Sequence, residues 1–279
     1  MKKVIFSILF FSVILRGGIW GQRINETIPL TSPSDSIIEK QGWQLIFSDE
    51  FEGDGLDELK WWPQTGTHAS ELQYYTPRKE NVYVSDGLLH LRAIKETFKD
   101  SLPYTSGMVF SSVEFGKGNF IEIRCKIPKG RGLWPAFWFW SGHNEIYQEL
   151  DVFEFWSHDT KRFCITNHWN KVSGEPIRSE PYWISPRTKE GKKIDLSTTF
   201  MTYSVYWDDK SILFLLNNQL VAKIKNNIPP NPFPIILNLA IDSGKAKRPD
   251  KKTIFPAEFL IDYVRVYKRE NAVSELIRR

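Results

Sequence analysis

The stretch Glu149–Trp156, ELDVFEFW, places three acidic residues in an otherwise apolar segment. Its Val, Phe and Trp residues favour β-strands. In a regular strand the side chains alternate between two faces, so Glu149 and Asp151 would share one face and Glu154 would lie on the other. One extra residue, inserted as a β-bulge at Val152–Phe153, returns Glu154 to the face of the other two acids. We therefore predict a bulged strand with all three carboxyl groups, and Trp156, on one open face.

Carboxyl groups placed in this way suit the hydrolysis of glycosidic bonds. The outer two glutamates would lie about four strand steps apart, roughly 13 Å between Cα atoms. If they lean toward each other over Asp151, their carboxyl groups could approach to about 5–5.5 Å, the separation that retaining glycosidases use. Three acids on one face are costly for structure alone, because their charges repel and burial penalises each. The alternative is a solvated strand face on which the acids have no joint role.

The rest of the chain reads as a succession of short strands. Segments such as NFIEIRCKI, SILFLLNNQLVAKI and FLIDYVRVYK are separated by turn signals such as SDG, PKGRG and DDK. Hydrophobic residues make up 41% of the 279 residues, with 11 Trp, which is ample for a core and leaves tryptophans for binding surfaces. These patterns predict an all-β sandwich in a single domain, residues 42–270, followed by a polar tail, residues 271–279.

The N-terminus has the pattern of a secretory signal peptide, residues 1–21, with a basic start, an apolar centre and a small-residue exit. Its apolar run is too short to span a bilayer. Residues 22–41 are polar and contain Pro and Ser, as a linker or pro-segment does. Loss of the signal removes three basic residues and lowers the formal charge from +4 to +1, so the charge does not favour nucleic-acid binding. We expect a secreted or periplasmic protein.

The chain has two cysteines, Cys125 and Cys164, and no cysteine spacing typical of a metal site. After export they could form one disulfide, or they could remain two buried thiols. The sequence leaves both possibilities open.

The motif ELDVFE resembles the E-x-D-x-x-E signature of glycoside hydrolase family 16, in the bulged form of its laminarinase-like members. The resemblance covers nearly the whole domain. It includes WQLIFSDEFEGDGLDELKW, ELQYY, YTSG, GLWPAFWFW just upstream of the acids and DYVRVY near the end, in the family's order. It implies a jelly-roll (concanavalin A-like) sandwich of two curved antiparallel sheets, with the polysaccharide lying across the concave face.

The resemblance also implies roles for the three acids. Glu149 would be the nucleophile, Glu154 the general acid and then the base, and Asp151 would orient Glu149. Because three clustered acids cannot all ionise freely, one of them should have a raised pKa, and a protonated Glu154 beside an ionised Glu149 would suit the first step.

Aromatic residues near the acids are candidates for stacking on sugar rings. Sugar contact is predicted for Trp134, Trp138, Trp156 and His168, the last in the segment TNHWN, and Trp140 and Asn238 are weaker candidates. The alternative, with no role in binding, is that some of the tryptophans belong to the core and that the histidine is a packing residue.

Members of the family often bind a structural Ca²⁺ on the convex side. By resemblance its oxygen ligands would come from Glu50, Gly87 and Asp262, a donor set that suits a hard cation. The alternative is that the two acids make ordinary hydrogen bonds. No cofactor is expected for catalysis.

The substrate is the least determined feature. A β-1,3-glucan or mixed-linkage β-glucan is the leading expectation, with a monomeric enzyme. The sequence departs from the laminarinase pattern at Ser70, at Met108 and after NLA, where a basic loop follows: Lys245, Lys247, Arg248, Lys251 and Lys252. With Arg131, this loop keeps sulfated galactans (agar, porphyran or carrageenan types) as an alternative, because Arg and Lys pair with sulfate esters. The alternative is that the basic run is a solvated surface loop. A transglycosylase would use the same two glutamates, and a lectin would not need them.

Overall fold

The computed structural model describes residues 42–269, except 69–70, 100–101, 142–145, 228–231 and 245–246. The predicted signal peptide, linker and polar tail lie outside the described residues, as do Ser70 and Lys245, and the domain boundaries remain a prediction. The described residues form 17 β-strands and no α-helix. Among them, nothing helical is long and apolar enough to cross a bilayer.

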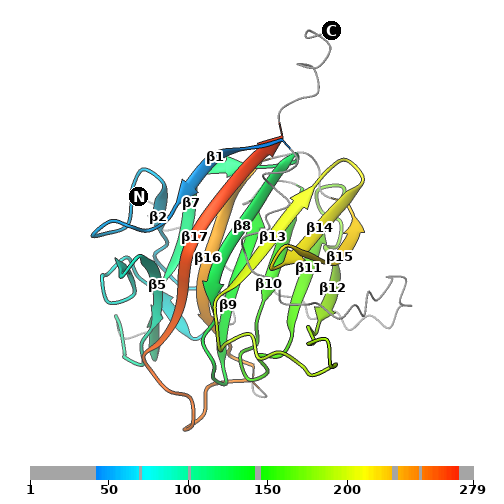
Figure 1. The fold of residues 1–279 in the computed structure, drawn as a ribbon. Helices are drawn as coiled ribbons and strands as arrows, with labels where there is room; N and C mark the ends of the chain where they lie inside the picture. Colours follow the sequence, from blue (N-terminus) through cyan, green and yellow to red (C-terminus); the bar gives the residue numbers. More distant parts are fainter. Residues whose placement is uncertain are drawn as a thin grey trace, which may run out of the picture.

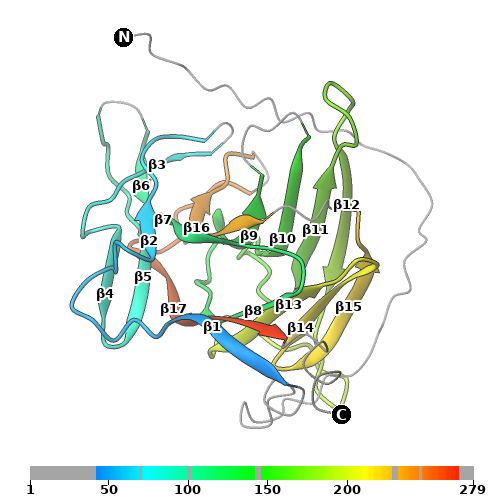
Figure 2. The same cartoon turned by 90° about the horizontal axis from the view of Figure 1, so that it is seen from above.

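Two large antiparallel sheets pack face to face (Figures 1 and 2). The seven-stranded sheet has the strand order β12-β11-β10-β9-β16-β7-β2. Its strands are β12 Arg178–Ile184, β11 Phe163–Trp169, β10 Gln148–Glu154, β9 Leu133–Trp140, β16 Phe233–Ile241, β7 Met108–Phe115 and β2 Trp61–Pro63.

The second sheet has eight strands in the order β15-β14-β13-β8-β17-β5-β4, and β1 also pairs with β17. Its strands are β15 Gln219–Lys225, β14 Ser211–Leu216, β13 Met201–Trp207, β8 Asn119–Lys126, β17 Ala257–Arg269, β5 Leu88–Ala93, β4 Val82–Ser85 and β1 Trp43–Asp49. A short parallel pair, β3 Gln73–Tyr75 and β6 Tyr104–Ser106, forms a third, two-stranded sheet. The predicted sandwich of two antiparallel sheets is confirmed.

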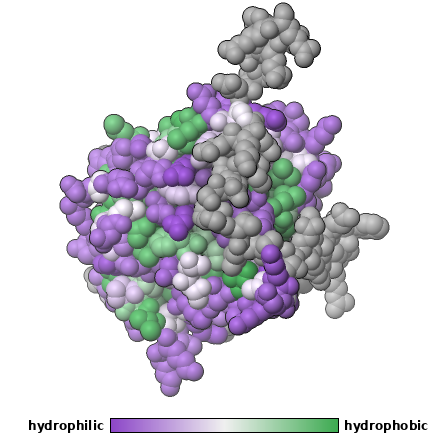
Figure 3. Space-filling model, in the orientation of Figure 1, coloured by the Kyte–Doolittle hydropathy of each residue, from purple (hydrophilic) through white to green (hydrophobic). Residues whose placement is uncertain are grey.

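The core fills the space between the two sheets. It is built from alternate strand residues, as in β14, where Ile212, Phe214 and Leu216 are buried and their neighbours are partly exposed. Strand β10 contributes Leu150 and Phe153, and the Phe153 ring lies 4.5 Å from that of Tyr203 on the opposite sheet. The side of the molecule that carries the eight-stranded sheet is mostly hydrophilic at its surface (Figure 3).

Strand β10 has the predicted bulge. Against β9, Asp151 pairs with Trp138 and Glu154 with Ala136, and the register shifts between Asp151 and Phe153. The pairing of β10 with β11 shifts at the same place. Val152 and Phe153 both face the core, so Glu154 returns to the face of the other two acids.

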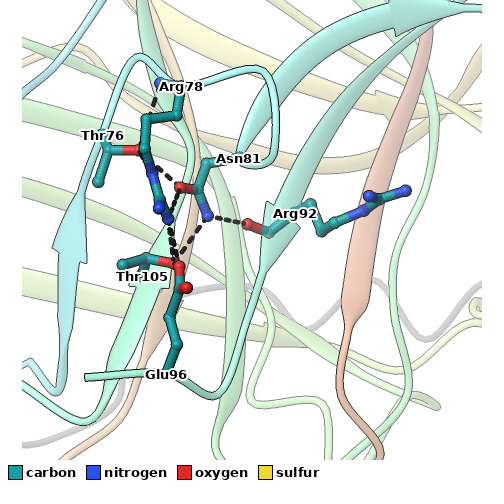
Figure 4. A network of polar contacts seen from close by, with 6 residues as sticks. All are labelled: Thr76, Arg78, Asn81, Arg92, Glu96 and Thr105. Carbon is teal, nitrogen blue, oxygen red and sulfur yellow. Dashed lines mark hydrogen bonds and ion pairs between the residues drawn. The ribbon is translucent and has the colours of Figure 1, made fainter. Parts of the chain in front are cut away.

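A buried polar network fixes the segment after β3 (Figure 4). The Asn81 side chain accepts a hydrogen bond from Thr76 Oγ1 at 2.6 Å and donates one to Thr105 Oγ1 at 3.0 Å. Arg78 pairs with Glu96 and donates to Asn81 Oδ1 at 3.0 Å. Because Thr76 follows directly on β3, this network holds β3 in place.

Both cysteines are buried free thiols, Cys125 on β8 and Cys164 on β11. The sequence left open a disulfide or two buried thiols, and the structure has two buried thiols. The strands lie in different sheets, with the core between them.

Candidate active site

The three acids of β10 lie in a cleft of about 660 Å³ on the outer face of the seven-stranded sheet. The Asp151 side chain is 4% exposed and that of Glu149 13%. Each is therefore reachable from the cleft yet largely withdrawn from water. The four predicted sugar-contact residues line the same cleft, and so do both weaker candidates, Trp140 and Asn238.

Glu154 is held from two neighbouring strands. Trp134 on β9 donates its indole N–H to Glu154 Oε1 at 3.1 Å, and Thr166 on β11 donates its hydroxyl to Glu154 Oε2 at 3.3 Å. Burial raises the pKa of Glu154 well above its usual range, and the charges of Asp151 and Glu149 add to the increase. Glu154 is thus the carboxyl group best suited to carry a proton at neutral pH.

Glu149 accepts a hydrogen bond from the hydroxyl of Tyr147. Burial and the neighbouring Asp151 raise the pKa of Glu149 to about 7, while His168 and Tyr147 favour its ionised form. Burial also raises the pKa of Asp151. The acids thus differ in their donors: Glu149 has a phenol and an imidazole nearby, and Glu154 an indole and a hydroxyl.

His168 on β11 is the cation of the cluster. Its Nε2 lies 3.3 Å from Asp151 Oδ2 and 3.7 Å from Glu149 Oε1, and its Nδ1 lies 2.7 Å from Ser179 Oγ. Burial alone would lower the pKa of His168, but Asp151 and the other carboxylates raise it to about 9. A protonated His168 offsets part of the negative charge, which explains how the strand holds three acids side by side.

The tryptophans form the apolar surface of the cleft. Trp156 follows β10, where Phe155 N donates to Pro135 O, so pairing with β9 continues and Trp156 stacks on Trp134 at 5.8 Å between centroids. Trp138 donates its indole N–H to Asn238 Oδ1 at 2.8 Å, and Asn238 Nδ2 donates to Tyr75. The alternative of a pure core role does not hold for these rings, because they line the cleft.

Several cleft residues were not predicted from the sequence. Tyr147 lies two residues before Glu149 in the sequence. Because residues two apart in a strand share a face, this spacing could have indicated that Tyr147 points into the cleft. Trp183 on β12 lines the cleft with its ring 5.2 Å from that of Trp156. Glu71, whose pKa burial raises to about 7, and His68 come from the segment before β3. The backbones of Glu71 and Asp242 are joined by an isolated antiparallel β-bridge. This contact links two segments that are distant in the sequence, and no local pattern indicates it.

Glu149, Asp151 and His168 place their ligand-type atoms within 4.8 Å of one another, a grouping that could hold a metal ion. Their mutual pairing explains the grouping without one, because the imidazolium of His168 already offsets one of the two negative charges.

The residues predicted to bind calcium lie elsewhere. Glu50 accepts two hydrogen bonds of 2.8 Å from the guanidinium of Arg265, and Asp262 pairs with Arg124. Gly87 is in the turn between β4 and β5. Both carboxylates thus have an arginine partner, an arrangement that does not fit a cation ligand set as it stands. Calcium binding remains a prediction from the resemblance.

A protein-family model that describes the domain of β-porphyranases A–D in glycoside hydrolase family 16 matches residues 43–269. The chain belongs to glycoside hydrolase family 16. The match covers every strand of both sheets and the whole of the cleft, which confirms the resemblance read from the ELDVFE motif.

Among relatives of this family 16 chain, the glucan endo-1,3-β-glucosidase A1 of Niallia circulans is 29% identical over 88% of the chain. The β-glucanase of Rhodothermus marinus is 29% identical over 84%. The chain spans 40% of the length of the first and 88% of the second. The laminarinase catalytic domain of Thermotoga maritima superimposes with a TM-score of 0.70 at 31% identity, covering 83% of this chain and all of that domain.

Proposed function

We propose that this family 16 protein is a retaining endo-hydrolase of β-linked polysaccharide, with a β-1,3-glucan or mixed-linkage β-glucan as substrate. The observation that carries the proposal is the bulge in β10. It aligns Glu149 and Glu154 on one face, each with its own set of hydrogen-bond donors. The relatives named as glucanases support the choice of substrate.

In the first step the Glu149 carboxylate attacks the anomeric carbon while Glu154 gives its proton to the leaving-group oxygen. The glycosidic bond breaks and an ester between the sugar and Glu149 forms. In the second step the Glu154 carboxylate takes a proton from water, the water oxygen attacks the anomeric carbon, and Glu149 leaves. Two inversions at one carbon give net retention of configuration.

The surrounding residues would prepare these two states. Tyr147 and His168 stabilise the ionised Glu149, and burial keeps Glu154 protonated until the leaving group takes its proton. Asp151, between the two glutamates, holds His168 in place. The tryptophans would bind the sugar rings on either side of the cleaved bond.

The test is a reducing-sugar assay on laminarin, barley β-glucan, agarose, porphyran and κ-carrageenan. Glu149→Ala and Glu154→Ala should each lower turnover by several orders of magnitude, whereas Glu114→Ala, an exposed glutamate on β7, should not. Near wild-type turnover in either cleft variant would contradict the assignment. With an aryl glycoside whose leaving group needs no proton, Glu154→Ala should retain formation of the ester, and Glu149→Ala should not.

A sulfated galactan is the second candidate, supported by cations beside the aromatic surface and by the β-porphyranase family model. Lys247 Nζ lies 4.2 Å from the centroid of the Trp156 ring, and the Arg162 guanidinium lies 4.4 Å from that of Trp183. Arg162 also pairs with Asp159 at 3.0 Å, which leaves Lys247 as the stronger candidate for a sulfate ester.

The basic loop is docked against the loop that carries Arg131. Arg131 Nε donates to Arg248 O at 3.0 Å, and a Cβ on Gly132 would lie 2.3 Å from Pro249, so only glycine allows this approach. These contacts fix the residues that follow Lys247, whose ammonium lies over the ring of the cleft residue Trp156. Lys247→Gln should lower activity on porphyran and leave activity on laminarin unchanged if sulfate is recognised there; equal effects would reject this candidate.

A further inference from the structure

An exposed tryptophan occupies the edge strand β2, outside the cleft. Trp61 and Trp62 are neighbours on this strand: Trp61 is fully buried in the core, while Trp62 is 44% exposed. The Trp62 ring stacks on Phe110 with centroids 4.2 Å apart and an interplanar angle of 11°. Phe110 covers one face of the indole, so the exposed area of Trp62 lies on its other face and its edge.

Trp62 lies on the same face of the sheet as the catalytic acids. It pairs with Phe110 on β7, Phe110 pairs with Ile236 on β16, and Ile236 pairs with Trp138 on β9. Trp138 in turn pairs with Asp151. Directly paired residues on neighbouring strands point to the same side of a sheet. Four strand spacings separate Asp151 from Trp62, a path of roughly 19 Å at ~4.8 Å per spacing.

The residues between Trp62 and the cleft form a buried apolar cluster. Phe110 forms a buried cluster with Tyr75, Met108 and Ile236, and the cleft tryptophans Trp138 and Trp140 pack against it. Tyr75 and Met108 also line the cleft. The cleft thus ends on one side of this cluster, and Trp62 stacks on its outer member, Phe110. A ring supported in this way loses little freedom when a ligand binds its open face.

We propose that Trp62 is an outer sugar-binding platform, which stacks on one pyranose ring of the polysaccharide chain that occupies the cleft, several sugar units from the cleaved bond. This inference rests on the proposed function. The apolar C–H face of a pyranose suits an aromatic plane, and the in-register row from Asp151 to Trp62 places both residues on one face of the sheet. Because Ile236 and Phe110 in this row are buried, the polysaccharide would pass above the cluster to reach Trp62. Only a polymer or a long oligosaccharide can reach both places at once.

The test compares substrates of different length. KM and kcat are measured on the polysaccharide that wild type cleaves best and on the shortest oligosaccharide of the same linkage that it cleaves. Trp62→Ala should raise KM for the polymer roughly 3- to 10-fold, the range expected for one aromatic contact. KM for the short substrate and both kcat values should not change. Trp62→Tyr should restore most of the affinity, and Leu59→Ala, an 87% exposed apolar residue before β2, is the matched control.

The outcomes separate the two proposals. If wild type cleaves no β-linked polysaccharide, the proposed function fails and this inference fails with it. If wild type cleaves both substrates and Trp62→Ala affects neither, or both equally, only the outer platform is rejected. A change in oligomeric state of Trp62→Ala on size exclusion would assign the ring to a subunit contact and would also reject it. Unfolding midpoints of the variants show whether each remains folded.

Discussion

Replacing Tyr147 with phenylalanine isolates one hydrogen bond of the proposed nucleophile. The phenol of Tyr147 donates to Glu149, and Tyr147 is a partly buried residue that lines the cleft. Tyr147→Phe keeps the ring and removes only the donor. A hydrogen bond to a charged group stabilises it by about 1.5–3 kcal/mol, and one pKa unit corresponds to about 1.4 kcal/mol. The pKa of Glu149 should therefore rise by about 1–2 units from its value of about 7.

The sign of the effect on activity follows from the role of Glu149. The nucleophile acts as a carboxylate, so a higher pKa removes activity at low pH and leaves it at high pH, until Glu154 loses its proton. The acidic limb of kcat/KM should move upward by about 1–2 pH units. Well below the wild-type limb the variant should be about 10- to 100-fold slower, and above the shifted limb the two enzymes should converge. A water molecule that replaces the phenol would bring the shift to the lower end.

The assay is kcat/KM for the best polysaccharide, measured from about pH 5 to about pH 10, since kcat/KM reports the free enzyme. Tyr182→Phe is the control, because Tyr182 on β12 donates to Glu180 and not to the three acids of β10. An acidic limb that stays in place would refute the role given to Tyr147. A loss of equal size at every pH would do the same, since it would point to misplaced substrate rather than to the ionisation of Glu149.

Three further predictions concern other parts of the molecule. His168→Gln removes the cation beside Glu149 and Asp151, so the acidic limb of the kcat/KM profile should again move to higher pH. An acidic limb at the wild-type pH would mean that His168 does not favour the ionised form of Glu149. Phe153→Ala should lower the free energy of unfolding by about 3–5 kcal/mol, because the ring is fully buried in the core. Denaturant titration measures this free energy, and a loss below about 1 kcal/mol would count against tight packing at the bulge. If calcium binds at Glu50, Gly87 and Asp262, the thermal unfolding midpoint should be higher in calcium than in EDTA. Equal midpoints would contradict calcium binding there and agree with the arginine pairing of the two acids.

Local patterns were sufficient for the strand that carries the acids. The alternation of apolar and acidic residues in ELDVFEFW predicted the bulge and the common face of the three acids. Trp138, predicted to contact sugar, and the weaker candidate Trp140 both line the cleft. These predictions succeed because strand geometry fixes the face of a side chain from its neighbours alone.

Contacts between distant segments were not predictable in the same way. Nothing near Trp183 in the sequence indicates that its ring meets Trp156, because β12 is an edge strand whose place in the sheet depends on the whole topology. The arginine partners of Glu50 and Asp262 are of the same kind: Arg265 is 215 residues from Glu50 in the sequence. The state of the two cysteines also depended on which sheet each strand joins.

The spacing of the acids in space depends on strand register rather than on residue count. On β9 the partners of Glu149 and Glu154 are Trp140 and Ala136, four positions apart, although five positions separate the two glutamates. A regular strand one residue shorter would present the same three carboxyl groups at the same spacing. The extra residue therefore adds nothing to the distance across the cleaved bond; its effect is to turn both Val152 and Phe153 into the core. The bulge thus adds a core residue to the strand that carries the three acids without changing the spacing of their carboxyl groups, so the motif has to be compared by strand register and not by residue count.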